Sequence, residues 1–220
     1  MHRRTPLGPE TYLPQIPLPP MLSIRSATDP GTCLRLLLSL VACLGLAHCS
    51  KHEFNNIDIS GAEYAREFSL TDTSGRHRTL ADYRGKIVIV FFGYTQCPDL
   101  CPATLAELAQ VRRSLGPDSS RIQVLFVSLD PARDTPQLLA RYVPGFDPTF
   151  VGLYGTEPEI EATAREFRIF YQKVAGSTPT NYTLDHTAGC YVFDAQGRVR
   201  LFVRGQARPE EIASDLKRLL

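Results

Sequence analysis

The chain has 220 residues, of which 43% are hydrophobic and 21% charged, and its formal net charge is +1 at pH 7. This composition is typical of a globular protein and excludes a disordered chain, a collagen-like chain and a small disulfide-stapled domain. The near-neutral charge, with no basic stripe, argues against nucleic-acid binding. Sulfur is distributed unevenly, because both methionines lie in the first 21 residues and three of the six cysteines in the first 49.

Residues 1–48 have the features of an export leader. A proline-rich stretch precedes Met21, which could itself be the initiator, and an apolar run of twelve residues follows at 36–47. This run suits the hydrophobic part of a signal peptide and is shorter than the roughly 20 residues of a transmembrane helix. An uncleaved short anchor is the alternative. We interpret residues 49–60 as a linker and residues 61–220 as one folded domain.

Two cysteines of the leader region are candidates for lipid attachment. Residues 40–43 resemble a bacterial lipobox that ends at Cys43. The residues before Cys49 resemble a lipobox too, although His48 is a poor residue beside a cleavage point. Ordinary cleavage after Ala47 is a third option. All three options export the protein, so we predict a periplasmic location in a bacterial envelope, with a membrane-anchored lipoprotein in two of the three.

The first half of the domain alternates strand and helix patterns. A turn signal at 73–75 lies between two short alternating segments and predicts an N-terminal hairpin over 67–80. A continuous apolar run at 87–92 predicts a strand buried on both faces. A helix at 103–115, with hydrophobic residues at helical spacing, and a second buried strand at 122–129 complete a β-α-β unit.

The second half predicts further helices and a second hairpin. Asp134 or Thr135 caps a helix that runs to 143 with proline in its first turn. An extended segment at 150–153, a helix at 157–167, two strands at 189–194 and 199–203, and a closing helix at 209–220 follow. This order predicts an α/β, thioredoxin-like fold with a central mixed sheet flanked by helices.

The residues with distinctive chemistry lie at 97–102, Cys-Pro-Asp-Leu-Cys-Pro, between the strand at 87–92 and the next helix. Cys97 and Cys101 are four residues apart, so at a helix start they share one face. The helix dipole favours thiolates there, and we expect the pKa of both thiols to be lowered. Two adjacent thiolates form a disulfide or bind a soft metal ion. A plain stabilising disulfide is the alternative.

His186 is the third candidate ligand. Residues 185–187 precede the strand at 189–194, in the loop that a thioredoxin-like sheet places beside the first helix. Two thiolates and one imidazole form a three-coordinate site that suits Cu(I) and can take up Cu(II). Asp185 could orient the imidazole from behind. A histidine in this position is by default an ordinary surface or core residue, so only the paired cysteines favour a ligand role.

These motifs resemble the Sco/SenC family of copper chaperones for cytochrome c oxidase assembly. The resemblance extends from about residue 56 to the end and rests on residues 59–62, 91–95, 97–105, 128–131, 133–136 and 185–188. It implies a thioredoxin-like fold that binds one copper ion through Cys97, Cys101 and His186. It further implies delivery of copper, or of reducing equivalents, to the copper-bearing subunit of the oxidase. Because copper loads only onto reduced thiols, we also expect a partner thiol reductase in the envelope.

Two residues depart from the family pattern. Gln96 occupies a position where histidine is frequent in relatives, and the family pattern does not require a cysteine at position 190. An extended chain would place Cys190 roughly 13 Å from His186, too far to bind the same ion. We interpret Cys190 as a small core residue.

Two other functions remain open at the same cysteines. A thiol–disulfide oxidoreductase or redox sensor would use Cys97 as the attacking and Cys101 as the resolving thiol. The three residues between the cysteines, and the lack of a cis-proline candidate, favour the metal instead. A peroxidase of the same fold fits less well, because Thr95 is two residues before Cys97 rather than three.

Overall fold

The structure is a computed structural model that describes residues 53–178 and 181–220. The predicted leader and both candidate lipid-bearing cysteines, Cys43 and Cys49, lie outside the described residues. Within the described part of the chain, no helix is both long enough and apolar enough to cross a membrane.

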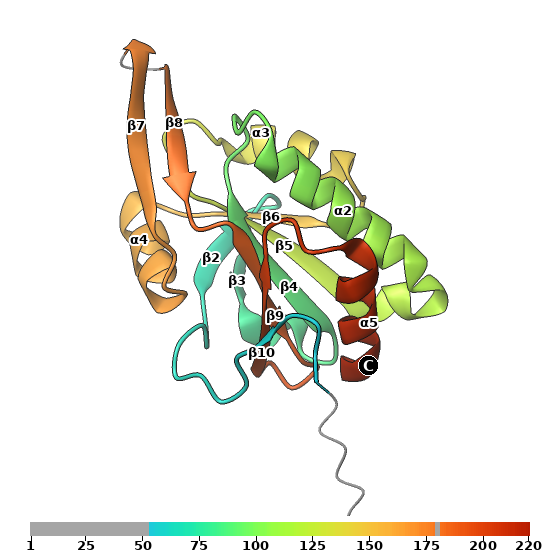
Figure 1. The fold of residues 1–220 in the computed structure, drawn as a ribbon. Helices are drawn as coiled ribbons and strands as arrows, with labels where there is room; N and C mark the ends of the chain where they lie inside the picture. Colours follow the sequence, from blue (N-terminus) through green and yellow to red (C-terminus); the bar gives the residue numbers. More distant parts are fainter. Residues whose placement is uncertain (1–52, 179–180) are drawn as a thin grey trace, which may run out of the picture. The chain divides into compact units, whose positions relative to one another are not determined.

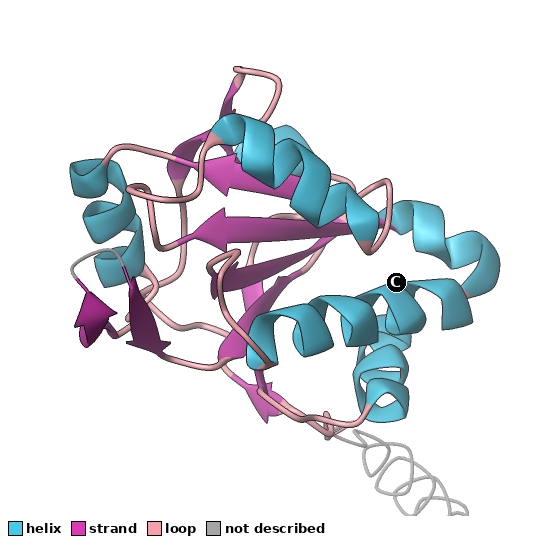
Figure 2. Ribbon diagram, turned by 90° about the horizontal axis from the view of Figure 1, so that it is seen from above, coloured by secondary structure: helices cyan, strands magenta, loops and turns pink. Residues whose placement is uncertain are grey.

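An eight-stranded mixed sheet forms the centre of the fold, in the order β1-β10-β9-β4-β5-β6-β2-β3. The neighbours β4, β5 and β6 are parallel, whereas β9 runs antiparallel to β4. Helices lie on both sides of this sheet (Figures 1 and 2), which confirms the predicted α/β architecture. The strands of the sheet are β1 (Ile57–Asp58), β2 (Ser69–Asp72), β3 (His77–Thr79), β4 (Ile87–Gly93), β5 (Ile122–Ser128), β6 (Val151–Tyr154), β9 (Gly189–Phe193) and β10 (Val199–Arg204).

The helices follow the predicted order. Their bounds are α2 (Leu100–Ser114), α3 (Pro136–Tyr142), α4 (Glu157–Glu166) and α5 (Pro209–Leu219), with short 3-10 turns at η1 (Leu80–Tyr83), η2 (Gly116–Arg121) and η3 (Val143–Gly145). Thr135 caps α3 by accepting a hydrogen bond from the Leu138 N–H at 3.2 Å. Thr156 forms a capping box with Glu159 at the start of α4. Both caps explain why these helices begin where the sequence predicts.

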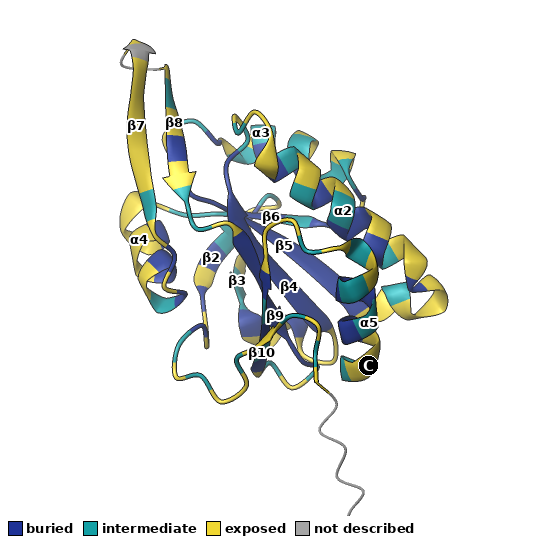
Figure 3. Cartoon of the chain, in the orientation of Figure 1, coloured by how far each residue is buried: buried dark blue, intermediate teal, exposed yellow. Residues whose placement is uncertain are grey.

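The β4-α2-β5 unit is the part of the fold that positions the cysteines. Every residue of β4 and of β5 is buried (Figure 3), as expected for strands covered on both faces. Helix α2 begins at Leu100, three residues before the predicted start. Pro102 is compatible with this start because a proline in the first helical turn needs no N–H partner. Cys101 therefore lies within the helix.

A hairpin that the sequence did not predict carries His186. Its strands, β7 (Tyr171–Thr178) and β8 (Asn181–His186), form a separate two-stranded sheet in which Tyr171 faces His186. Figure 1 shows the hairpin projecting beside α4. Most described side chains of β7 are exposed, and β8 alternates over only three residues, Tyr182, Leu184 and His186, of which one is fully buried. The segment therefore gives only a weak period-two hydrophobic signal. His186 is accordingly the last residue of a strand and not part of a loop.

The start of the described chain is bound to the last helix. Asp215, which is 1% exposed, accepts hydrogen bonds from the backbone N–H and the side-chain amide of both Asn55 and Asn56, each at 2.9 Å. Strand β1 then pairs with β10. These contacts lie within the stretch that the sequence predicts as a linker, so the ordered fold begins before residue 61.

Candidate metal centre

Cys97 and Cys101 lie where β4 ends and α2 begins. Cys97 is half-buried just before the helix, whereas Cys101 is 0% exposed in its first turn, and both are free thiols. The Cys101 N–H points at the Cys97 sulfur, with 3.3 Å between N and Sγ. The Cys97 sulfur thus accepts from one of the first N–H groups of α2, which have no partner within the helix, while the N-cap residue Asp99 makes no side-chain capping hydrogen bond. The helix start brings both sulfurs to one place, as the four-residue spacing predicts.

The pKa of the Cys101 thiol is shifted in the direction opposite to the one that the helix dipole alone predicts. Burial removes water from the sulfur and raises the pKa of Cys101 well above its usual range, despite a stabilising backbone hydrogen bond from Tyr94. The predicted lowering is therefore wrong for Cys101, because the cost of desolvating a thiolate exceeds the attraction of the helix N-terminus. A nearby cation would favour the charged form of this sulfur.

His186 faces the buried sulfur. Its Nε2 lies 3.8 Å from the Cys101 Sγ, and its Nδ1 donates a hydrogen bond to the Thr187 carbonyl at 3.1 Å. Because a carbonyl can only accept, the proton resides on Nδ1. The lone pair of Nε2 then points toward the Cys101 sulfur. Burial also lowers the pKa of His186, which favours the neutral imidazole that binds metals.

Asp185 is exposed on the outward face of β8. The hydrogen bond that orients the His186 ring comes from the backbone at Thr187, and the Asp185 charge acts on the imidazole only as a smaller effect that raises its pKa. The Tyr94 ring stands edge-on to the imidazole, with 6.2 Å between the ring centroids. The imidazole is thus held from two sides by β8 and the end of β4.

A cavity of about 460 Å³ opens beside these side chains. Its lining combines the cysteine segment with the end of β8: Tyr94, Cys97, Pro98, Asp99, Leu100, Thr183, Leu184, Asp185 and His186. Cys97 and His186 are therefore reachable from solvent, and Cys101 lies behind them.

Cys190 lies apart from the candidate ligands Cys97, Cys101 and His186. It lies in β9 opposite Phe91, is 3% exposed, and burial raises the pKa of its thiol to about 12. This placement agrees with the core residue that the sequence predicts.

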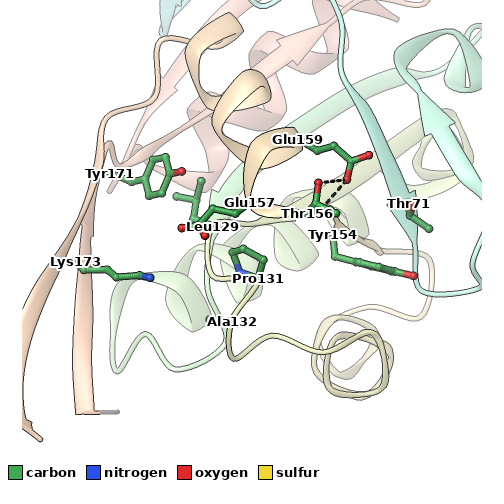
Figure 4. A pocket seen from close by; sticks show the side chains of 11 residues that line it. Thr71, Leu129, Pro131, Ala132, Tyr154, Thr156, Glu157, Glu159, Tyr171 and Lys173 are labelled. Atoms are coloured by element: carbon green, nitrogen blue, oxygen red, sulfur yellow. Dashed lines mark hydrogen bonds between the residues drawn. The ribbon is translucent and has the colours of Figure 1, made fainter. Parts of the chain in front are cut away.

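A larger cavity, of about 690 Å³, also lies apart from the cysteines. Figure 4 shows it between the start of α4 and strand β7, with Tyr171 and Lys173 on one side and Pro131 on the other. Neither cysteine nor His186 lines it, so size alone does not identify the functional site.

A buried carboxylate, Asp134, anchors the cysteine segment; the sequence offered it only as an alternative helix cap, a role that Thr135 takes instead. Asp134 is 2% exposed and accepts hydrogen bonds from the Thr95 N–H at 3.0 Å, the Thr95 hydroxyl at 2.5 Å and the Ser128 hydroxyl at 2.6 Å. Thr95 lies two residues before Cys97, and Ser128 ends β5. The motif at 128–136 contributes to the family resemblance, but its contact with residue 95 appears only in three dimensions.

The mixed sheet and the long helix after its central strand define a thioredoxin-like fold. At the start of that helix, one buried thiol faces an imidazole and a second, half-buried thiol lies beside them. The SCO1/SenC family model matches residues 58–220. The chain belongs to this family, which confirms the resemblance found in the sequence.

The relatives agree with this assignment. A SCO2-like protein of Rickettsia felis is 34% identical over 164 residues, which cover 74% of this chain and 78% of the relative. The mitochondrial SCO2 homolog of Bos taurus is 36% identical over 69% of this chain, but the match spans only 58% of the bovine protein. Among solved structures, copper-bound ScoI of Bradyrhizobium japonicum is 41% identical with a TM-score of 0.65, over 70% of this chain and 98% of that one.

Proposed function

We propose that this chain is a copper metallochaperone that binds one copper ion through Cys97, Cys101 and His186. The observation that supports it most directly is the 3.8 Å between the Cys101 Sγ and the His186 Nε2. Bonds of about 2.3 Å to a thiolate and about 2.0 Å to an imidazole are typical of a d¹⁰ ion. Two such donors at trigonal or tetrahedral angles lie about 3.5 to 3.7 Å apart. The two side chains therefore have the separation of neighbours on one ion.

Cys97 has to turn to complete the site. No three histidine, cysteine or acidic side chains among residues 53–178 and 181–220 already converge as a metal site. The Cys97 sulfur instead faces the Cys101 N–H. Cys97 is half-buried, borders the open cavity and precedes the helix. A ligand of this kind can join last and leave first, which suits transfer by ligand exchange.

Copper fits the chemistry of the donor set. Thiolates are soft ligands that select Cu(I), and adding an imidazole also permits Cu(II). A bound cation would offset the desolvation that raises the pKa of the Cys101 thiol. The related Bradyrhizobium protein has been solved with copper bound. The recipient follows from the family resemblance, which implies the copper-bearing subunit of cytochrome c oxidase.

An anaerobic copper titration of the reduced protein tests this proposal. We expect one equivalent to bind to the wild type, much weaker binding to His186→Ala, and no tight binding to Cys97→Ala, because each change removes a ligand. Cys190→Ala is the matched control, since it removes a thiol from the core without touching the centre. Unchanged affinity in Cys97→Ala would contradict the proposal.

Thiol–disulfide exchange at the same cysteines is the alternative that a second assay separates. The half-buried Cys97 and fully buried Cys101 would be the attacking and resolving thiols. An oxidoreductase should retain its exchange activity in His186→Ala, whereas a metallochaperone should lose copper delivery in that variant. Activity that survives while copper binding fails would favour the redox function.

Copper affinity is expected to rise with pH between about pH 6 and pH 8. Burial raises the pKa of Cys101, so this residue enters the reaction as a thiol and must release a proton to bind the metal. The lowered pKa of His186 keeps the imidazole neutral over most of this range, so protons compete little with copper for its ring nitrogen. Each released proton gives about a tenfold gain in affinity per pH unit. Competition titrations at constant ionic strength measure the slope, and a flat profile contradicts the expectation.

We further propose that the chain acts in a bacterial envelope, held at the membrane by a lipid on Cys43 or Cys49 or by its signal segment. A thiol reductase of the envelope would keep Cys97 and Cys101 reduced for loading. The leader sequence and the Rickettsia relative support this location. Mass spectrometry of the mature N-terminus identifies the modified cysteine, and an unmodified terminus after Ala47 excludes both lipid sites.

A further inference from the structure

We propose that Arg133 is a positioning residue of the metal centre, because it holds the hairpin that carries His186 against the segment that carries Cys97. The proposal rests on the proposed function, since it concerns the same three ligands. The hydrogen bonds and ring contacts of Arg133 go to Asp130, Gln96, Tyr94 and Tyr182 and not to the ligands themselves. Its importance comes from contacting both the hairpin that carries His186 and the segment that carries Cys97, which we call the two halves of the site.

The need for such a clamp follows from the topology. Strands β7 and β8 pair only with each other and not with the eight-stranded sheet. Two residues join His186 to β9, but the hairpin that carries it does not pair with β4 or β9. The orientation of the hairpin against the cysteine segment therefore depends on side-chain contacts as well as on this short connection. Along β8, residues Tyr182, Leu184 and His186 alternate with exposed residues and share the inward face.

Arg133 binds the hairpin through Tyr182. One guanidinium nitrogen donates to the Tyr182 carbonyl at 2.8 Å, and the guanidinium carbon lies 3.5 Å from the centroid of the Tyr182 ring. Stacking and hydrogen bonding therefore act on the same residue, which shares its face of β8 with His186.

Arg133 also contacts the cysteine segment. The same nitrogen donates to the Gln96 side-chain oxygen at 3.3 Å, and the guanidinium lies 5.7 Å from the Tyr94 ring centroid. Gln96 precedes Cys97 directly, and the Tyr94 ring stands against the imidazole of His186. One cation thus joins the two segments that supply the three ligands.

Asp130 fixes the orientation of this cation. It is 1% exposed and accepts hydrogen bonds from the Arg133 Nε at 2.5 Å and from the Tyr182 hydroxyl at 2.6 Å. Its own N–H donates to the Ser128 hydroxyl at the end of β5. The carboxylate therefore ties arginine and tyrosine to the rigid sheet, and the Arg133 side chain is only 13% exposed.

Copper affinity of Arg133→Ala, alone and combined with His186→Ala, tests the proposal. Removing a residue that orients a metal ligand typically lowers affinity about 10- to 100-fold, and we expect a loss of this size. If Arg133 acts through His186, the double variant should bind copper no more weakly than His186→Ala alone. Tyr182→Phe, which removes only the hydroxyl bonded to Asp130, should show a smaller loss of the same kind.

Arg200→Ala is the matched control. Arg200 also pairs with a buried carboxylate, Asp194 at 3.4 Å, and lies over an aromatic ring, Phe54 at 5.8 Å, but contacts neither half of the centre. It should retain wild-type copper affinity. Amide hydrogen exchange in the metal-free protein adds a readout that needs no copper: Arg133→Ala should accelerate exchange in β7 and β8 while leaving β4 and β5 protected.

Three results would overturn the proposal: wild-type affinity in Arg133→Ala, losses that add in the double variant, or exchange that accelerates equally throughout the main sheet. Failure of the proposed function has a different signature. In that case the wild type binds no copper, while Arg133→Ala still loosens the hairpin.

Discussion

Replacing Asp134 with alanine is expected to lower the free energy of unfolding by about 3 kcal/mol. The buried carboxylate accepts three hydrogen bonds, two from Thr95 and one from Ser128. Its removal leaves the buried Ser128 hydroxyl, and the N–H and hydroxyl of half-buried Thr95, without these partners. A fully buried group without a partner costs about 1 to 3 kcal/mol, and a half-buried one costs less because water reaches it. Part of that cost is recovered, because burial disfavours the charged carboxylate and raises the pKa of Asp134. The net loss is therefore smaller than the sum over three groups.

Urea unfolding of Asp134→Ala measures this loss, with Asp118→Ala as the control at an exposed position. The same variant should release the segment between Thr95 and Cys97, so its copper affinity should fall even under conditions where the protein remains folded. Equal midpoints for the two variants would show that Asp134 does not anchor the cysteine segment.

Replacing Gly93 with alanine is the second change with a large expected effect. A Cβ at this position would lie 2.9 Å from the Cys101 Sγ and 2.9 Å from Cε2 of Phe126. Phe126 is fully buried and packs against the rings of Phe91 and Tyr142, so it has no space into which to move. Overpacking of this kind costs about 1 to 3 kcal/mol. The strain also displaces the sulfur that faces His186.

Gly93→Ala should therefore lose both stability and copper affinity. Gly145→Ala is the control, because its added Cβ would meet no atom within 4 Å apart from the local backbone around it. Thermal unfolding and the anaerobic copper titration give the two readouts. A Gly93→Ala protein with normal copper affinity would show that the Cys101 sulfur need not remain where the structure places it.

Local patterns in the sequence predict most of the main sheet and its helices. The apolar runs at 87–92 and 122–129 identify β4 and β5, because strands covered on both faces need apolar residues throughout. Threonine caps mark the starts of α3 and α4. The sequence did not predict the hairpin of β7 and β8, because β7 is mostly exposed and the alternation along β8 covers only six residues with one fully buried side chain.

The sequence by itself determined the fold class, the family and the residue types of the candidate site. Two cysteines at helical spacing and a histidine before a strand are local features, readable without coordinates. Only the tertiary structure decided how they act. Burial raises the pKa of Cys101 where the helix dipole alone would lower it. The proximity of Asp134 to Thr95, and of Arg133 to both Gln96 and Tyr182, depends on segments distant in the chain. Desolvation and long-range contacts arise only when the chain has folded.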